Sequence, residues 1–123
     1  MNKSPEQIVE TFIDKWNAMD VQGALAMMAE DAVWDNIPLG PAKGMAEIQA
    51  VMAQFPEAQG IAFVTHHIAA NGNVVLTERT DKFLIGEKWR SLRVMGAFEI
   101  NDQGQIQHWR DYFDLAEMQR EFA

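Results

Sequence analysis

Runs of strand-forming residues joined by tight turns fill the second half of the chain, and they constrain its fold more than any other feature. Asn71-Gly72 and Gly86-Glu87 separate the first three runs, and residues of these types tolerate the positive φ angles of a two-residue hairpin turn. A third turn, at residues 101–104, precedes a fourth run. Strands joined this closely lie antiparallel, so the sequence predicts an antiparallel sheet with strands at residues 61–70, 74–85, 88–100 and 105–113.

The first half of the chain carries helix signals instead. Ser4 and Gln7 form a capping-box pattern, and Pro5 takes the first helical position. An apolar stripe follows at helical spacing, formed by Ile8, Phe12, Trp16 and Met19. Asp20 is the predicted cap of a short second helix, and a third helix is predicted over residues 44–55. The buried side of the second helix is expected to carry Val21, Leu25 and Met28.

The remaining elements complete an α+β pattern. A short strand is predicted at residues 33–37, before a Pro/Gly loop at residues 38–41 that neither a helix nor a central strand would accept. Asp114 and Glu117 form a second capping-box pattern, which predicts a terminal helix to about Phe122. Helices segregated from a mainly antiparallel sheet define the α+β class. A length of 123 residues predicts one domain, spanning residues 1–123.

Composition excludes several classes of function. The formal net charge of −8 argues against nucleic acid or an anionic membrane as a partner, because binding to phosphates needs a basic surface. The chain has no cysteine, which excludes disulfides, thiolate metal sites and cysteine nucleophiles. Neither a membrane-spanning apolar run nor a secretory signal is recognisable, so we expect a cytoplasmic protein.

Polar side chains interleave with aromatic residues on three of the predicted strands. Because strand residues two apart share a face, Arg79 and Asp81 lie on the same side as Phe83. Asp111 likewise lies between Trp109 and Phe113, and Asn36 shares a face with Trp34. A curved sheet covered by the helices would gather these groups in a cavity. Two carboxyl groups beside one guanidinium are expected to retain one proton between them, which provides an acid and a base.

Simpler interpretations of these residues exist, and other chemistries lack their motifs. An Arg-x-Asp pair on a strand is more often a surface ion pair than a catalytic group. His66 and His67 are adjacent and therefore predicted to point to opposite faces, which argues against a shared metal ion. Gly40, Lys43 and Gly44 do not form a phosphate-binding loop, and no acyl-enzyme motif is present.

The ordered combination of motifs resembles the limonene-1,2-epoxide hydrolase family, within the SnoaL-like, nuclear-transport-factor-like group. The resemblance covers nearly the whole chain and is densest from about His67 to Leu115. It is carried by Thr77-Glu78-Arg79-Thr80-Asp81, by Val94-Met95-Gly96-Ala97-Phe98 with Trp109-Arg110-Asp111-Tyr112-Phe113-Asp114, and by Trp34-Asp35-Asn36-Ile37-Pro38-Leu39. It implies a cone-shaped fold, in which a curved, mainly antiparallel mixed sheet holds the N-terminal helices over its concave face.

The resemblance also implies the residue roles of a one-step hydrolysis that uses water, a small apolar epoxide and neither cofactor nor metal. Asp111 would be the base, Asp81 the acid, Arg79 the bridge between them, and Asn36 the group that orients the water. Trp34 stands where the family usually has a tyrosine, and its indole N–H can donate to water but cannot accept from it. The substrate would contact Phe83, Leu92, Val94, Trp109 and Phe113.

The resemblance further implies a homodimer through the outer face of the long strands. Leu76 and Leu84 suit such a contact, whereas Glu78 and Lys82 would need partners there. Two other functions stay open: a SnoaL-like cyclase or ketosteroid-isomerase-like enzyme with one dominant carboxyl group, and a ligand-binding module without catalysis. An enzyme of the first kind would tolerate loss of Arg79, and the module would bind apolar ligands without forming product.

Overall fold

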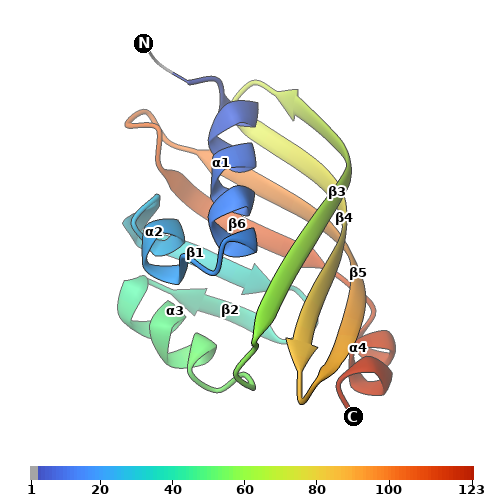
Figure 1. The fold of residues 1–123 in the computed structure, drawn as a ribbon. Helices are drawn as coiled ribbons and strands as arrows, with labels where there is room; N and C mark the ends of the chain where they lie inside the picture. Colours follow the sequence, from blue (N-terminus) through green and yellow to red (C-terminus); the bar gives the residue numbers. More distant parts are fainter. Residues whose placement is uncertain (1–2) are drawn as a thin grey trace.

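The computed structural model describes residues 3–123 and consists of helices packed around a six-stranded sheet (Figure 1). The helices are α1 (Pro5–Asn17), α2 (Val21–Leu25), α3 (Met45–Met52) and α4 (Leu115–Glu121). The strands are β1 (Met28–Asn36), β2 (Gly40–Lys43), β3 (Gly60–Asn71), β4 (Val74–Ile85), β5 (Lys88–Ile100) and β6 (Ile106–Tyr112). Their order is β2-β1-β6-β5-β4-β3, with β1 parallel to β6 and the other neighbours antiparallel. The predicted α+β class is therefore confirmed.

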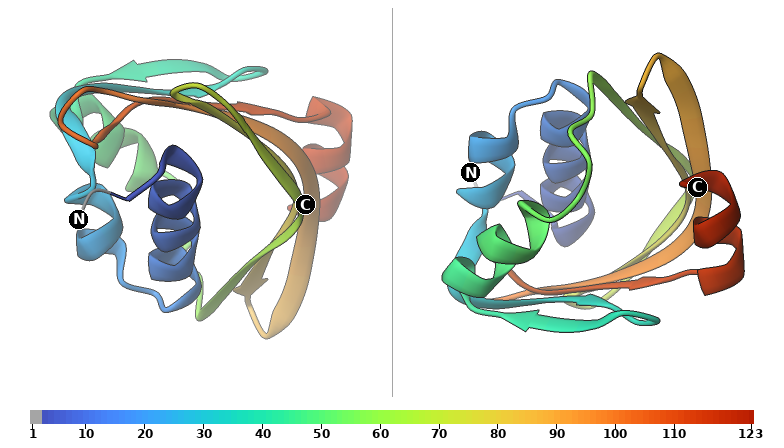
Figure 2. Two further views of the ribbon diagram at one scale, coloured as in Figure 1. Left: turned by 90° about the horizontal axis from the view of Figure 1, so that it is seen from above. Right: turned by 90° about the horizontal axis from the view of Figure 1, so that it is seen from below.

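The sheet curves around α1, α2 and α3, whereas α4 lies outside the curve (Figure 2). Phe12 of α1 is fully buried and packs edge-on against Trp109 of β6, with ring centroids 5.1 Å apart. Burial of one such side chain stabilises the fold by about 1.5–3 kcal/mol. The core thus fills the concave side, as the predicted cone with its N-terminal helices requires. Within residues 3–123, no helix combines the length and the apolar character needed to cross a membrane.

The start of α1 is as predicted, but its apolar stripe is shorter. Ser4 Oγ accepts the Gln7 N–H at 3.2 Å, and Gln7 Oε1 accepts the Ser4 N–H at 2.9 Å, which completes the capping box. The helix ends at Asn17, and Met19 follows with a φ of +60° and an exposed side chain. The prediction that Met28 belongs to the second helix is also wrong, because α2 ends at Leu25 and Met28 is the first residue of β1.

The long strands follow their turn signals closely. β4 and β5 have the predicted bounds, and the Gly86-Glu87 turn has φ angles of +60° and +66°. The first hairpin turn lies one residue later than predicted: Asn71 pairs with Val74, and Gly72, with a φ of +63°, is the first turn residue. Glycine at that place is typical of a type II′ turn.

The two edge strands of the sheet are β2, which was not predicted, and β3, which is bound by a side chain of α1. β2 forms where a loop was predicted, and Pro41 is tolerated because β2 is an edge strand. At the opposite edge, the Asn17 side chain of α1 accepts the Phe63 N–H of β3 at 2.6 Å and donates to its carbonyl at 3.3 Å. Asn17 therefore takes the place of a neighbouring strand at that point of β3.

α4 covers a stretch of β5 that β6 does not reach. The pairing of β5 with β6 extends only from Met95 to Ile100, which leaves residues 88–94 without a partner on that side. Glu117 accepts the Arg93 N–H at 2.9 Å, and Glu121 accepts the Ser91 N–H at 3.1 Å. The predicted capping box of α4 is wrong for this reason: Asp114 caps the helix through the Ala116 N–H, but Glu117 contacts β5 instead.

Candidate active site

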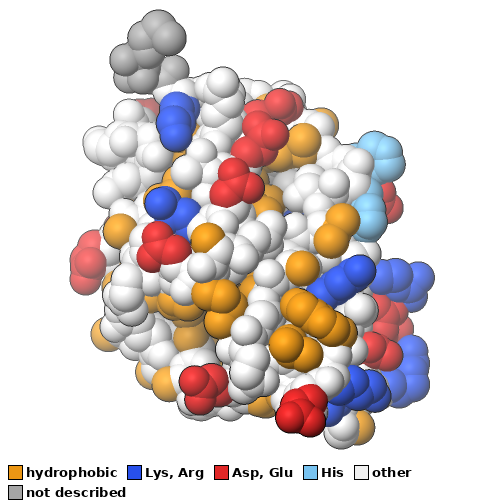
Figure 3. Space-filling view, in the orientation of Figure 1, with side chains coloured by type: hydrophobic (Ala, Val, Ile, Leu, Met, Phe, Trp, Pro, Cys, Tyr) orange, Lys and Arg blue, Asp and Glu red, His pale blue; other side chains and the backbone are white. Residues whose placement is uncertain are grey.

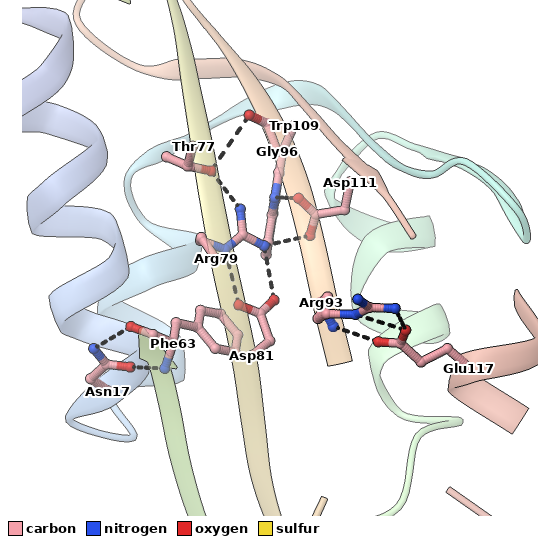
Figure 4. A network of polar contacts seen from close by, with 10 residues as sticks. All are labelled: Asn17, Phe63, Thr77, Arg79, Asp81, Arg93, Gly96, Trp109, Asp111 and Glu117. Atoms are coloured by element: carbon pink, nitrogen blue, oxygen red, sulfur yellow. Dashed lines mark hydrogen bonds and ion pairs between the residues drawn. The ribbon is translucent and has the colours of Figure 1, made fainter. Parts of the chain in front are cut away.

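Arg79 lies at the centre of a buried polar network on the concave face of the sheet (Figure 4). Its Nε and Nη2 donate to Asp81 Oδ1 and Oδ2 at 3.0 and 2.8 Å, which is a bidentate ion pair. Nη2 also donates to Asp111 Oδ2 at 3.1 Å. The three side chains are 1%, 4% and 5% exposed, so these charges interact with little screening by water. The structure thus brings together the Arg79, Asp81 and Asp111 side chains that the sequence singled out.

The guanidinium lies between two aromatic rings. Its Cζ atom is 5.7 Å from the centroid of Phe63 on β3 and 5.8 Å from that of Phe98 on β5. Cation–π attraction to the two rings favours the charged guanidinium there. Although burial opposes its charge, the neighbouring Asp111 and Asp81 raise the pKa of Arg79 above its already high ordinary value. Arg79 is therefore a permanent cation.

Sequence reasoning assigned no role to two further residues that touch this guanidinium. Thr77 Oγ1 accepts a hydrogen bond from Arg79 Nη1 at 2.9 Å. Gly96 lies opposite Thr77 on one side and Asp111 on the other. A Cβ atom on Gly96 would lie 2.2 Å from Arg79 Nη1, so the guanidinium occupies the space of the absent side chain. The signal that could have revealed both residues is the register of β4, β5 and β6.

Asp111 has two donors and a raised pKa. Trp109 Nε1 donates to its Oδ1 at 2.9 Å, while Arg79 binds its other oxygen. Burial raises the pKa of Asp111 and the nearby Asp81 raises it further, whereas Arg79 and the Trp109 hydrogen bond lower it. A carboxylate with a raised pKa is a stronger base than an ordinary one, which suits it to accept a proton from water.

Both carboxyl groups lie on the wall of a cavity of about 510 Å³. The structure places Phe83, Leu92, Val94, Trp109 and Phe113, the predicted substrate contacts, on the same wall. Residues that the sequence did not suggest also contribute, among them Met52, Phe55, Met118 and Phe122. Apolar side chains gather on the surface below α1, between α3 and the lower parts of β3 and β4 (Figure 3). The cavity therefore offers a polar end and a hydrocarbon wall.

Asn36 and Trp34 reach this cavity from β1. Asn36 is directly opposite Asp111 in the parallel β1–β6 pair, and its side-chain amide makes no hydrogen bond with any other group of residues 3–123. Trp34 stacks on Trp109 with ring centroids 5.5 Å apart. The Trp34 Nε1 atom is buried and has no partner in the described chain, so its predicted contact with a water molecule stays a prediction.

The two adjacent histidines lie outside this site and do not have the predicted orientations. The register of β3 against β4 shifts between Thr65 and His67, which marks a bulge. His66 Nε2 and His67 Nδ1 each lie 2.8 Å from a side-chain oxygen of β4, on Thr80 and Glu78 respectively. Thr80 and Glu78 share the outer face, so both histidines lie on that side. Among residues 3–123, no group of His, Asp and Glu side chains is arranged to hold a metal ion.

Comparison with known proteins identifies a family. The model of the limonene-1,2-epoxide hydrolase catalytic domain matches residues 3–123. Epoxide hydrolase EphG of Mycobacterium tuberculosis is 34% identical over 110 residues, which is 89% of this chain and 73% of the relative.

Solved structures agree in fold. A limonene-epoxide-hydrolase-like epoxide hydrolase of M. tuberculosis superposes with a TM-score of 0.81 at 32% identity, covering 95% of this chain and 87% of that one. A nuclear-transport-factor-2-like protein of unknown function from Burkholderia pseudomallei has a TM-score of 0.82 at 20% identity, covers 98% of both chains, and supports the fold alone. The chain belongs to the limonene-1,2-epoxide hydrolase family.

Proposed function

We propose that this protein hydrolyses a small apolar epoxide to a vicinal diol in a single acid–base step. Membership of the limonene-1,2-epoxide hydrolase family supports epoxide hydrolysis as the activity. The observation that carries the mechanism is that Asp81 and Asp111 lie on the wall of one cavity and are both bound by Arg79 Nη2. Two carboxyl groups and one guanidinium with a single shared proton are neutral overall, which suits a water-poor site.

In the reactive state that we propose, the proton shared by the two carboxyl groups has moved to Asp81, and Asp111 is ionised. Asn36 and Asp111 hold a water molecule, Asp111 removes its proton, and the water oxygen attacks an epoxide carbon. The C–O bond breaks as Asp81 gives its proton to the epoxide oxygen, so that no free alkoxide forms. The proton on Asp111 then returns to Asp81 between turnovers. The step balances with water alone, so the proposal requires no cofactor.

The apolar character of the substrate follows from the rest of the wall. The charged or amide side chains on the wall of the cavity are those of Asn36, Glu57, Asp81 and Asp111. A ligand with several polar groups would leave them unpaired against hydrocarbon, which costs about 1–3 kcal/mol for each group. A substrate with one reactive oxygen and an apolar body fits this wall best.

The test combines diol formation from a panel of epoxides with a single-turnover reaction in ¹⁸O-labelled water. Direct attack by water places the label in the diol during the first turnover, whereas an ester intermediate would deliver an unlabelled carboxylate oxygen. Asp81→Asn and Asp111→Asn should each abolish diol formation. Full activity of both variants, or an unlabelled first product, would contradict the mechanism. Loss on Asp111→Asn with little loss on Arg79→Ala would favour the ketosteroid-isomerase-like or cyclase alternative.

We also propose that two copies associate through the convex face. Met95 and Tyr112 lie directly opposite each other on β5 and β6, and Leu76 lies nearby on β4. These apolar side chains are 51%, 47% and 48% exposed. Sedimentation of the wild type and of Met95→Glu should show a dimer and a monomer respectively; a monomeric wild type would contradict this proposal.

A further inference from the structure

Thr77 shares a buried cross-strand row with Gly96 and Asp111. Thr77 faces Gly96 in the β4–β5 pairing, and Gly96 faces Asp111 in the β5–β6 pairing. Thr77 is 1% exposed and does not belong to the cavity wall. The Arg79 guanidinium extends over the glycine in the middle of this row, with Thr77 on one side and Asp111 on the other (Figure 4).

The contacts of the guanidinium are unequal. Asp81 holds the Nε and Nη2 edge with two bonds, of 3.0 and 2.8 Å. Asp111 is held by a single, longer bond of 3.1 Å from Nη2. On the remaining side, Nη1 donates to Thr77 Oγ1 at 2.9 Å, and the Thr77 hydroxyl lies 3.5 Å from the Gly96 carbonyl oxygen. Without the hydroxyl, the bidentate pair with Asp81 and the single, longer bond to Asp111 would alone fix the in-plane rotation of the guanidinium.

From this arrangement we infer that Thr77 is a positioning residue, whose hydroxyl holds the guanidinium at the angle where one nitrogen, Nη2, reaches both carboxyl groups. The inference rests on the proposed function for its catalytic consequence. A bidentate guanidinium pair has a fixed planar geometry, so a small rotation around Asp81 moves Nη2 away from Asp111. Because the Asp111 bond is the longest, it is the first to be lost.

A role for the hydroxyl and a role for the shape of the side chain make opposite predictions. Thr77→Val keeps the branched shape and removes the hydroxyl, whereas Thr77→Ser keeps the hydroxyl and removes a methyl group. If Thr77 only fills the core, valine should be tolerated and serine should not. If the hydroxyl positions Arg79, serine should behave like the wild type and valine should not.

Kinetics give the first measurement. Thr77→Val should lower kcat by about 10- to 100-fold, the usual loss when a catalytic group is misplaced. KM should change little, because Thr77 lies behind the cavity wall. The acid limb of the pH profile should also move to higher pH. Burial raises the pKa of Asp111 and the nearby Asp81 raises it further, whereas Arg79 and Trp109 lower it, so a weaker Arg79 contact lets that pKa rise.

Unfolding without substrate gives the second measurement. The free energy of unfolding is measured against pH for the wild type, Thr77→Val and Thr77→Ser. In Thr77→Val, the fall in the free energy of unfolding that comes from Asp111 should continue to higher pH than in the wild type. In Thr77→Ser, it should end at the same pH as in the wild type. If the valine variant does not fold, Thr77→Ala and Thr77→Ser differ by the same hydroxyl and replace the pair.

The outcomes separate the inference from the proposed function. Wild-type kinetics and pH dependence in Thr77→Val, or a larger loss in Thr77→Ser than in Thr77→Val, would overturn the role of Thr77. If the wild type turns over no epoxide, the proposed function fails, and the unfolding measurements still decide whether the hydroxyl controls the contact between Arg79 and Asp111.

Discussion

Trp109 Nε1 donates a 2.9 Å hydrogen bond to Oδ1 of Asp111, two residues further along β6. The two side chains share the concave face of the strand, so the indole both lines the cavity and fixes the carboxylate. The sequence predicted Trp109 as a substrate contact, and the structure adds this second relationship.

Replacing Trp109 with phenylalanine should slow the proposed reaction. The hydrogen bond lowers the pKa of Asp111, so its removal should raise that pKa and move the acid limb of the kcat/KM profile to higher pH. We expect a loss of about 10- to 100-fold at neutral pH. Trp16→Phe is the control, because Trp16 packs 5.9 Å from Trp109 and its Nε1 has no partner among residues 3–123. A pH profile that shifts equally in both variants would show that packing, rather than the bond, matters.

Asp111 should make the fold less stable as pH rises. Its pKa is higher in the folded than in the unfolded chain, so the folded state binds more protons between the two values. The free energy of unfolding should therefore fall from pH about 4, the ordinary value for aspartate, until the raised pKa is passed. The fall should be about 1.4 kcal/mol for each unit of the shift. Asp111→Asn should lack this component in urea titrations over the same range; an identical pH dependence in the two proteins would contradict the prediction.

Gly96→Ala should disrupt the site more than the fold. The new Cβ would lie 2.2 Å from Arg79 Nη1 and 2.8 Å from Asp111 Oδ1, so the guanidinium must move. We expect destabilisation of about 1–3 kcal/mol, as for other overpacked positions, and loss of most activity. Gly60→Ala is the matched control, since its Cβ would meet the tip of the half-exposed Trp89 side chain at 3.0 Å. Comparable activity in the two alanine variants would contradict the role of Gly96.

The attachment of α4 to β5 should be visible in hydrogen exchange. Glu117→Ala removes the acceptor of the Arg93 N–H, whereas Glu117→Gln keeps an acceptor oxygen. Exchange at the Arg93 amide should rise in the alanine variant and stay near the wild-type rate in the glutamine variant. Because Phe122 of the same segment packs 5.8 Å from Phe83 on the cavity wall, the alanine variant should also bind apolar ligands less selectively. Unchanged exchange at Arg93 in the alanine variant would rule out this tether.

The sequence predicted elements well where strong local signals mark both ends. β4 and β5 have their predicted bounds because turn residues enclose them. β1 begins earlier than predicted, since the bulge between Met28 and Val33 breaks its alternation. His66 and His67 share a face because the register of β3 against β4 shifts beside them. Local pattern carries no information on such shifts.

For the site, parity along each strand grouped Arg79 with Asp81 and Asp111 with Trp109. The contacts of Thr77 and Gly96 depend on how three strands align, and no single stretch of sequence contains that alignment. Glu117 shows the same limit, because a distant backbone N–H drew it away from the local capping box. Tertiary contacts outweighed the local preference in these cases.

The contacts at the two edge strands affect how readily the protein associates with itself at high concentration. An open sheet can recruit strands from other molecules and polymerise edge to edge. Pro41 has no backbone N–H to donate on the edge strand β2. On the edge strand β3, the Asn17 carboxamide binds the backbone N–H and carbonyl of Phe63. Each edge is thereby interrupted as a template for edge-to-edge growth, although the sheet does not close into a barrel.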